Sequence, residues 1–298
     1  MKYLFGPVPS RRLGLSLGLD LLPYKTCTLD CTYCQLGRTT NLTLKRERRI
    51  AAEDVLKEID AKSKESFDYF TLAGSGEPTL HLGLDEIIKG AKKIVDKPVA
   101  VLTNGTLFTK QEVRDEVAEA DLVIPSLDAA TQGTFQKINR PHPDLKIEAI
   151  IEGLTALREE FAGEIWLEVM FVKGLNDFEA EKIAQAAEMI GPDKIQLNTV
   201  VRPPADPVKP LSFEEMEKIQ TAFKDAEIIA EWSRDLAETK EVQVMDLLSR
   251  RPCTLKEMST LLNLHQNEVL KYLEILEREG KIERERLESK LYFRASEP

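Results

Sequence analysis

Short apolar runs alternate with amphipathic stretches over most of the chain, and this alternation constrains the fold more than any other feature. The apolar runs are rich in Val, Ile and Leu and are short enough to be buried strands. They lie at residues 16–22, 68–73, 98–102, 122–127, 165–172 and 194–200. Between and after them, apolar residues recur three or four positions apart, as in amphipathic helices. These predicted helices cover residues 52–61, 84–95, 110–118, 146–161, 178–190 and 212–226.

Six strands that are each followed by a helix predict parallel pairing with right-handed crossovers. Eight such units would close a full barrel, so six indicate an α/β fold with an open, partial (β/α)6 barrel. We expect this domain to cover residues 1–235, with its active face at the carboxyl ends of the strands. The last predicted helix begins with Ser212 and has Glu215 three residues later, which is the pattern of a capping box.

The pattern changes after residue 236, where shorter elements follow one another. Predicted helices cover residues 242–250, 254–262 and 266–279, and alternating segments at 281–286 and 290–294 resemble two small strands. Three helices and a hairpin are typical of a winged helix. We therefore expect a small C-terminal winged-helix domain over residues 236–298.

The charge of the chain argues against nucleic acid as its general partner. The 298 residues carry a formal net charge of −10, and the pI is about 5.1. An acidic protein repels phosphate backbones, and the predicted helix 266–279 has four glutamates against Lys271 and Arg278. We expect the winged helix to dock a protein or peptide, or to form a dimer surface. No apolar run spans a bilayer and no signal-peptide core is present, so we expect a cytoplasmic protein without membrane contact.

Three of the four cysteines fall within eight residues, as Cys27, Cys31 and Cys34 in the pattern CxxxCxxC. Thiolates are soft ligands that suit iron–sulfur sites or zinc. Three cysteines on a [4Fe–4S] cluster leave one of its irons open for another ligand. A structural zinc ion is the alternative, although such sites usually have four protein ligands. For Cys253, far along the chain, we expect a place in the winged-helix core rather than a redox role.

The three-cysteine loop follows the first predicted strand and has an aromatic residue, Tyr33, before its last cysteine. In this it resembles the radical S-adenosylmethionine (SAM) superfamily. A second segment after the second strand, Gly74-Ser75-Gly76-Glu77-Pro78, resembles the superfamily motif that binds the methionine amino group of SAM, with Ser75 in place of a glycine. Considered alone, this segment favours a simple glycine-rich turn after a strand.

Further polar residues end the later strands in the order that the superfamily shows. Asn104, Ser126, Asp128 and Asn198 are implied by the resemblance to contact SAM, and residues 168–177 resemble the stretch beside its adenine. Loop and cap roles are the alternative for each of them. Four arginines are candidate contacts for the substrate or the SAM carboxylate, or else surface charges: Arg11, Arg12, Arg140 and Arg202.

Two segments narrow the resemblance within the superfamily. Residues 5–14 and 139–143 look most like the iron–sulfur oxidoreductase branch related to wyosine-forming tRNA enzymes. Those enzymes carry additional cysteines for a second cluster, whereas this chain has one further cysteine. The wyosine-forming activity is therefore not part of the expectation.

The resemblance implies a [4Fe–4S] cluster and SAM as cofactors and an external electron donor of the flavodoxin or ferredoxin type. Reduction of the cluster would cleave SAM to a 5′-deoxyadenosyl radical, which takes hydrogen from a substrate. We expect this substrate to be a peptide, a protein or an RNA. The alternative is an iron–sulfur transcription regulator that senses redox state and binds DNA through the winged helix. The set of SAM-site segments favours the enzyme.

Overall fold

The computed structural model describes residues 3–202 and 204–230, and of the remainder 244–245, 247–249, 251–262, 269–270, 272–273, 276–277, 279–287 and 290–296. The chain divides into two compact units, Met1–Ala230 and Glu231–Pro298. The predicted domain boundary at residues 235–236 lies outside the described residues.

The first unit is built on one eight-stranded sheet with the order β1-β2-β5-β6-β7-β8-β9-β10. From β2 to β10 all neighbours pair in parallel, and β1 pairs antiparallel with β2 at one edge. All six predicted strands are present, and their ends lie within two residues of the predicted ends. The strands are β1 (Leu4–Ser10), β2 (Gly14–Asp20), β5 (Tyr69–Ala73), β6 (Val99–Thr103), β7 (Leu122–Pro125), β8 (Glu164–Phe171), β9 (Lys194–Thr199) and β10 (Ala226–Ile228).

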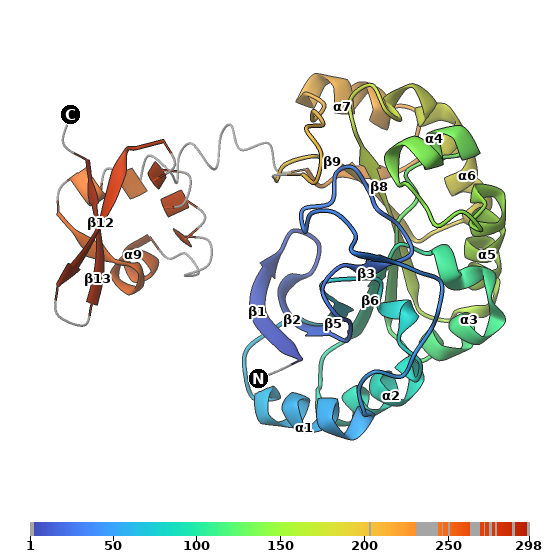
Figure 1. Ribbon diagram of the computed structural model, residues 1–298, viewed down its shortest axis with the longest axis horizontal. Helices are drawn as coiled ribbons and strands as arrows, with labels where there is room; N and C mark the ends of the chain where they lie inside the picture. Colours follow the sequence, from blue (N-terminus) through green and yellow to red (C-terminus); the bar gives the residue numbers. More distant parts are fainter. Residues whose placement is uncertain are drawn as a thin grey trace. The chain divides into compact units, whose positions relative to one another are not determined.

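Helices form an outer arc around this sheet, as Figure 1 shows. Each buries one apolar stripe against the strands and exposes its charged face. The helices are α1 (Ala52–Lys62), α2 (Leu84–Ile94), α3 (Gln111–Val117), α4 (Gln132–Ile138), α5 (Ile147–Glu160), α6 (Ala180–Ile190) and α7 (Phe213–Gln220). The fold is therefore the expected α/β partial barrel.

The structure corrects the sequence prediction at three elements. The strand β1 was not predicted because its sequence contains a glycine and two prolines, which an edge strand tolerates. The seven-residue helix α4 was also missed. The predicted helix 212–226 ends at Gln220, because Ala226–Ile228 instead pairs with the free edge of β9 as β10. Its start is as predicted, with the Ser212–Glu215 capping box formed.

The second unit contains a three-stranded antiparallel sheet in the order β11-β13-β12 and a helix, α9 (Leu255–Leu262). The strands are β11 (Cys253–Thr254), β12 (Ile282–Leu287) and β13 (Lys290–Ala295). Cys253 is fully buried in an apolar cluster with Met258, Leu273 and Phe293, as expected for a core residue. The predicted helices 242–250 and 266–279 fall partly outside the described residues, so the winged helix stays a prediction.

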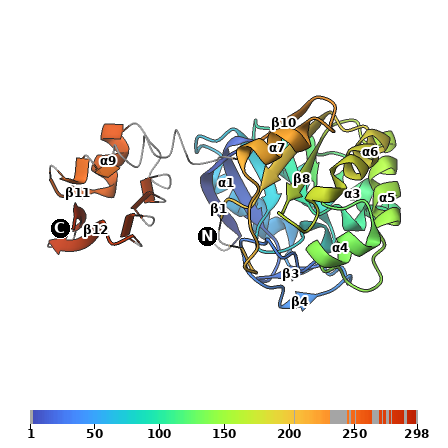
Figure 2. The same cartoon turned by 90° about the horizontal axis from the view of Figure 1, so that it is seen from above.

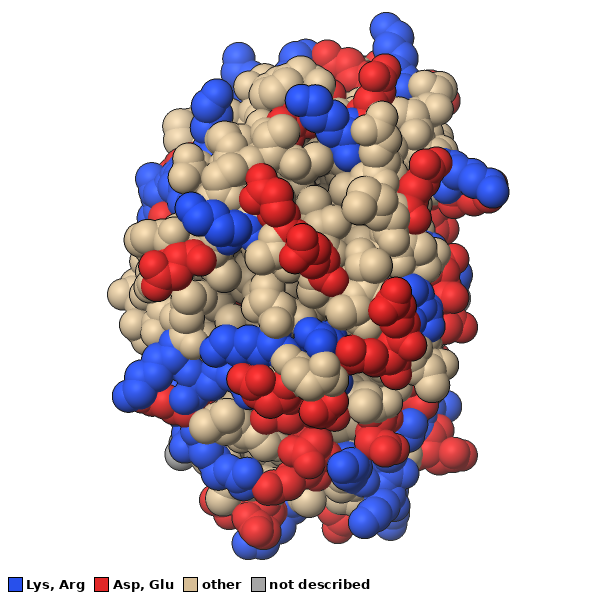
Figure 3. All heavy atoms as spheres, turned by 90° about the vertical axis from the view of Figure 1, so that its right-hand side faces the viewer, with Lys and Arg blue, Asp and Glu red and all other residues tan. Residues whose placement is uncertain are grey.

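No helix among the described residues is long and apolar enough to cross a membrane. The cytoplasmic location stays a prediction. On the face shown in Figure 3, Lys and Arg side chains intermingle with Asp and Glu side chains.

Candidate cofactor site

The three clustered cysteines lie on one loop after β2. Cys27 ends the short strand β3 (Thr26–Cys27), which pairs with β4 (Asn41–Leu42), and Cys31 and Cys34 follow in the connection between the two strands. Figure 2 shows β3 and β4 at one edge of the first unit. This part of the chain, residues 25–42, is called the cysteine loop here.

Backbone hydrogen bonds from distant segments hold the cysteine loop in place. Residues 74–78 contact its start and residues 138–142 contact its middle. The bonds run from Glu77 N–H to Thr26 oxygen (3.1 Å), from Lys25 N–H to Ser75 oxygen (2.7 Å), from Asp30 N–H to Asn139 oxygen (2.9 Å) and from Thr32 N–H to Ile138 oxygen (2.9 Å). The loop geometry is thus fixed by the fold, as preorganised binding of a ligand requires.

A cluster of ion pairs also holds the cysteine loop in place. Arg38 pairs with Asp30 at 2.9 Å and with Asp206 at 2.8 Å, and Arg140 pairs with the same two carboxylates. Arg140 was a candidate substrate contact, but the structure places it in this cluster, where it holds the cysteine loop. The segment 139–143 therefore has a structural place beside the cysteines.

Each of the three cysteine sulfurs accepts a hydrogen bond from a different nitrogen donor. Lys25 Nζ lies 3.0 Å from Cys34 Sγ, Asn104 Nδ2 lies 3.5 Å from Cys27 Sγ, and Asn139 Nδ2 lies 3.4 Å from Cys31 Sγ. Donors of this kind stabilise negative charge on sulfur and tune iron–sulfur centres. Lys25 and the side chain of Asn139 were not among the predicted site residues.

Burial makes two of the free thiols, those of Cys27 and Cys31, weakly acidic. It raises the pKa of Cys27 to about 11, with a further contribution from the charge of Glu77, and it raises the pKa of Cys31 as well. For Cys31 the charges of Asp128 and of the other two cysteines add to this shift. Ligation at these sulfurs therefore releases protons, as is usual for thiolate sites.

A single metal ion does not suit this arrangement. Among the residues that the structure describes, no three His, Cys, Asp or Glu side chains are placed to hold one ion. The zinc alternative gains no support. Neighbouring thiols with one nitrogen donor each fit a larger anionic group, such as an iron–sulfur cluster, in which each sulfur binds its own iron.

The segment Gly74–Pro78 lies against the cysteine loop, but the Glu77 carboxylate faces the protein. It is 2% exposed and accepts hydrogen bonds from Thr103 Oγ1 (2.5 Å), Thr79 Oγ1 (2.6 Å) and the Asn104 N–H (2.7 Å). Burial raises the pKa of Glu77 although these bonds oppose the shift. Glu77 thus ties this segment to the end of β6. Ser75 donates to Asp20 through its N–H and its hydroxyl.

Tyr33 and Asp128 connect the cysteine loop to the ends of β7 and β8. The Tyr33 hydroxyl donates to Asp128, which also accepts from Asn139 Nδ2 at 2.7 Å and from the Met170 N–H at 2.9 Å. Asp128 is 4% exposed, and burial raises its pKa to about 6. Both residues were predicted to contact SAM. In the structure, they form a hydrogen bond with each other.

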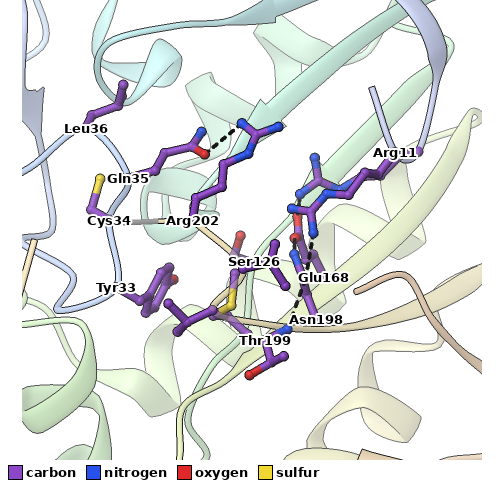
Figure 4. Close-up of a pocket in the computed structure, with 14 residues that line it drawn as sticks. Arg11, Tyr33, Cys34, Gln35, Leu36, Ser126, Glu168, Asn198, Thr199 and Arg202 are labelled. Atoms are coloured by element: carbon purple, nitrogen blue, oxygen red, sulfur yellow. Dashed lines mark hydrogen bonds and ion pairs between the residues drawn. The ribbon is translucent and has the colours of Figure 1, made fainter. Parts of the chain in front are cut away.

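A cavity of about 230 Å3 opens beside Cys34 at the carboxyl ends of β7, β8 and β9 (Figure 4). It brings together Tyr33, Ser126 and Asn198 from the predicted set. Asn104 and Asp128 line a separate, much smaller cavity, and the Gly74–Pro78 segment lines neither. The larger cavity is lined by Arg11, Arg12, Tyr33, Cys34, Gln35, Leu36, Ser126, Glu168, Met170, Asn198, Thr199, Val200, Val201 and Arg202.

A buried polar network forms one wall of this larger cavity. Arg12 pairs with Glu168, which also accepts from Asn198 Nδ2 at 2.9 Å, and Arg11 donates to Asn198 Oδ1 at 3.0 Å. Burial alone would raise the pKa of Glu168, but the charge of Arg12 holds it below its usual value. The turn between β1 and β2 supplies both arginines, so the unpredicted strand β1 is what positions them.

An open α/β barrel with three cysteines on the loop after its first parallel strand defines the class of protein. The sequence profile of the Radical SAM superfamily matches residues 21–187, more than half of the chain. This chain belongs to the radical SAM superfamily. Members of that superfamily use a [4Fe–4S] cluster and SAM, and they are enzymes that need an external electron donor.

Relatives include proteins named "UPF0026 protein". One from Methanocaldococcus jannaschii is 37% identical over 233 residues, covering 76% of this chain and 72% of the relative. One from Helicobacter pylori is 31% identical and covers 91% of each. A protein of Brachyspira hyodysenteriae named "GTPase Obg" is 36% identical over 95% of this chain. This chain spans only 44% of the length of that relative.

Solved structures with the same fold share little sequence. A radical SAM methyltransferase from Sphaerobacter thermophilus is 18% identical with a TM-score of 0.54, covering 74% of this chain and 68% of that one. The hydrogenase maturase HydG from Carboxydothermus hydrogenoformans is 16% identical with a TM-score of 0.50, covering 70% of this chain and 50% of HydG. These likenesses concern the fold. The nearness to wyosine-forming enzymes stays a prediction.

Proposed function

We propose that this protein holds its [4Fe–4S] cluster on Cys27, Cys31 and Cys34 and cleaves SAM reductively to start radical chemistry on a substrate. The observation that carries the proposal is the set of three neighbouring thiols, each with its own nitrogen donor, next to a cavity at the carboxyl ends of the strands. When bound, the cluster and SAM supply electron transfer and a radical that abstracts hydrogen.

The chain's own residues would orient the cofactors. Lys25, Asn104 and Asn139 stabilise the charge on the cysteine sulfurs. The backbone of Gly74, Ser75, Gly76 and Pro78 would meet the methionine part of SAM, with Glu77 fixing the segment from behind. Tyr33, Ser126, Asp128 and Asn198 would position the rest of SAM by hydrogen bonds and ring contact.

The partners belong to the same proposal. The electron donor would be a flavodoxin or ferredoxin, and the substrate a peptide, a protein or an RNA. The second unit would dock a protein or peptide, for which the exposed side chains of Leu261 and Leu291 offer apolar contacts. The family match gives no support to the alternative of a redox-sensing transcription regulator.

The cluster assignment is tested by iron and sulfide content after anaerobic reconstitution. Single changes of Cys27, Cys31 and Cys34 to Ala should each remove most of the bound iron and sulfide. Cys253→Ala is the matched control and should retain both, since Cys253 lies in the core of the other unit. Equal iron content in all four variants would refute the assignment.

A further inference from the structure

The large cavity combines positive charge with a chain that is acidic overall. Three arginines line it, Arg11, Arg12 and Arg202, against the single carboxylate of Glu168, whereas the whole chain has a net charge of −10. Charges in a cavity are screened less than those on an open surface. An anionic group entering the cavity would therefore be attracted to a local excess of cations.

Arg202 is the arginine best placed to receive such a group. It is exposed at the cavity and follows β9, and its Nη1 donates to the neutral Gln35 side chain at 2.9 Å. None of the carboxylates in the described part of the chain forms an ion pair with it. Figure 4 shows Arg202 extending toward Gln35, apart from the group of Arg11, Glu168 and Asn198.

Arg12 provides a second, independent indication. Its Nη2 pairs with Glu168, but its Nε is buried and has no acceptor among the described groups. A buried donor without a partner destabilises the folded protein, and an oxygen atom of a bound anion would satisfy it. Arg12 lines the same cavity as Arg202.

We propose that this cavity binds a carboxylate or phosphate group of the substrate through Arg202, assisted by Arg12. Guanidinium groups bind both anions through paired N–H donors. The inference rests on the proposed function, in which the Gly74–Pro78 segment meets the methionine part of SAM. That segment does not line this cavity. The carboxylate of SAM is a second source of such an anion, and the experiment distinguishes it from an anionic group of the substrate.

The test titrates the anaerobically reconstituted protein with inorganic phosphate and with acetate, with and without saturating SAM, by calorimetry. At least one anion should bind the SAM-loaded protein, more weakly at higher ionic strength. Arg202→Gln should weaken that binding about tenfold, the loss of roughly 1.4 kcal/mol, and Arg202→Lys should give an intermediate value. Arg158→Gln is the control, since Arg158 pairs with Asp193 and does not line the cavity.

Three results would overturn the inference. They are the absence of anion binding by the SAM-loaded protein, equal binding by wild type and Arg202→Gln, and an about tenfold loss of SAM affinity in Arg202→Gln. The last would identify the bound anion as the SAM carboxylate. The iron content and the SAM affinity of the same samples test the proposed function independently. If that function is wrong, the titration without SAM still shows whether Arg202 binds an anion.

Discussion

At the scale of residues, the nitrogen donors at the cysteine sulfurs set the electrostatics of the site. A reduced cluster carries one more negative charge than an oxidised one, so a cation beside its ligand stabilises the reduced state. Lys25 is the one charged side chain of the three donors, and it is only 3% exposed. It should therefore affect the redox potential more than either asparagine does.

Replacing Lys25 with Met should make the midpoint potential of the cluster more negative. The change removes a charge and a hydrogen bond at 3.0 Å from Cys34 Sγ. We expect a shift of about 60 mV, which corresponds to a tenfold change in the equilibrium constant of a one-electron couple. A redox titration followed by electron paramagnetic resonance measures it, with Lys25→Arg as the charge-retaining control. An unchanged potential in Lys25→Met would contradict this role.

The buried pair of Arg12 and Glu168 should make stability depend on pH. Arg12 lowers the pKa of Glu168 in the folded state, despite the opposing effect of burial. Such a carboxylate adds stability above its unfolded pKa, near 4.5, and that contribution is lost as pH falls through the folded pKa.

Glu168→Gln should therefore be less stable than wild type at neutral pH, by about 1–3 kcal/mol. The difference should shrink when urea unfolding is repeated well below pH 4.5. A difference that stays constant with pH would show that the ion pair does not contribute in this way.

These residues also show where sequence reasoning ends. The cysteine spacing is local and could be recognised directly. Asn139 is 108 positions from Cys31, and Arg12 is 156 positions from Glu168, so only the folded chain shows that they meet. Glu77 was expected to bind the methionine amino group, but no local pattern indicates that Thr79, Thr103 and Asn104 occupy its carboxylate.

At the scale of elements, the close approach of two loops positions the cysteines. A Cβ atom on Gly76 would lie 2.1 Å from the backbone oxygen of Thr26, next to Cys27. That oxygen accepts the hydrogen bond from the Glu77 N–H that joins the loops. Glycine at this position is required by space rather than by its backbone angles.

Gly76→Ala should destabilise the protein by about 1–3 kcal/mol and reduce its iron content, because the two loops must separate. Gly133→Ala in α4 is the control, since its Cβ meets no atom within 4 Å. Thermal unfolding and iron analysis of both variants provide the comparison. Equal behaviour of the two would show that the loops adjust without loss.

The central elements could be predicted because their signal is periodic. Each of the six predicted strands is an apolar run whose residues are mostly buried, whereas β10 has three partly exposed residues and gives no such signal. The strand β1 is interrupted by Gly6, Pro7 and Pro9 and forms only because β2 offers an edge. The elements that sequence reasoning missed are those stabilised by their neighbours.

At the scale of the whole molecule, the two units have separate hydrophobic cores, and we propose that they are separate domains. The cluster of Val244, Cys253, Met258 and Phe293 belongs entirely to the second unit. The cysteine loop, the Gly74–Pro78 segment and the cavity all belong to the first. The first unit should therefore contain the whole cofactor site.

Residues 1–230 expressed alone should fold and take up iron and sulfide as the full chain does. Circular dichroism, thermal unfolding and iron analysis compare the two proteins. The shortened protein should lose only those activities that require substrate docking on the second unit. Failure to fold or to bind iron would contradict the division into independent domains.

Formation of 5′-deoxyadenosine tests most directly whether this protein cleaves SAM reductively. The reconstituted protein is reduced with dithionite and given SAM, and the product is quantified by chromatography. We predict that the wild type and Cys253→Ala form 5′-deoxyadenosine and that Cys27→Ala, Cys31→Ala and Cys34→Ala do not. An intact cluster with no cleavage of SAM, with or without candidate substrates, would contradict the proposed radical SAM activity.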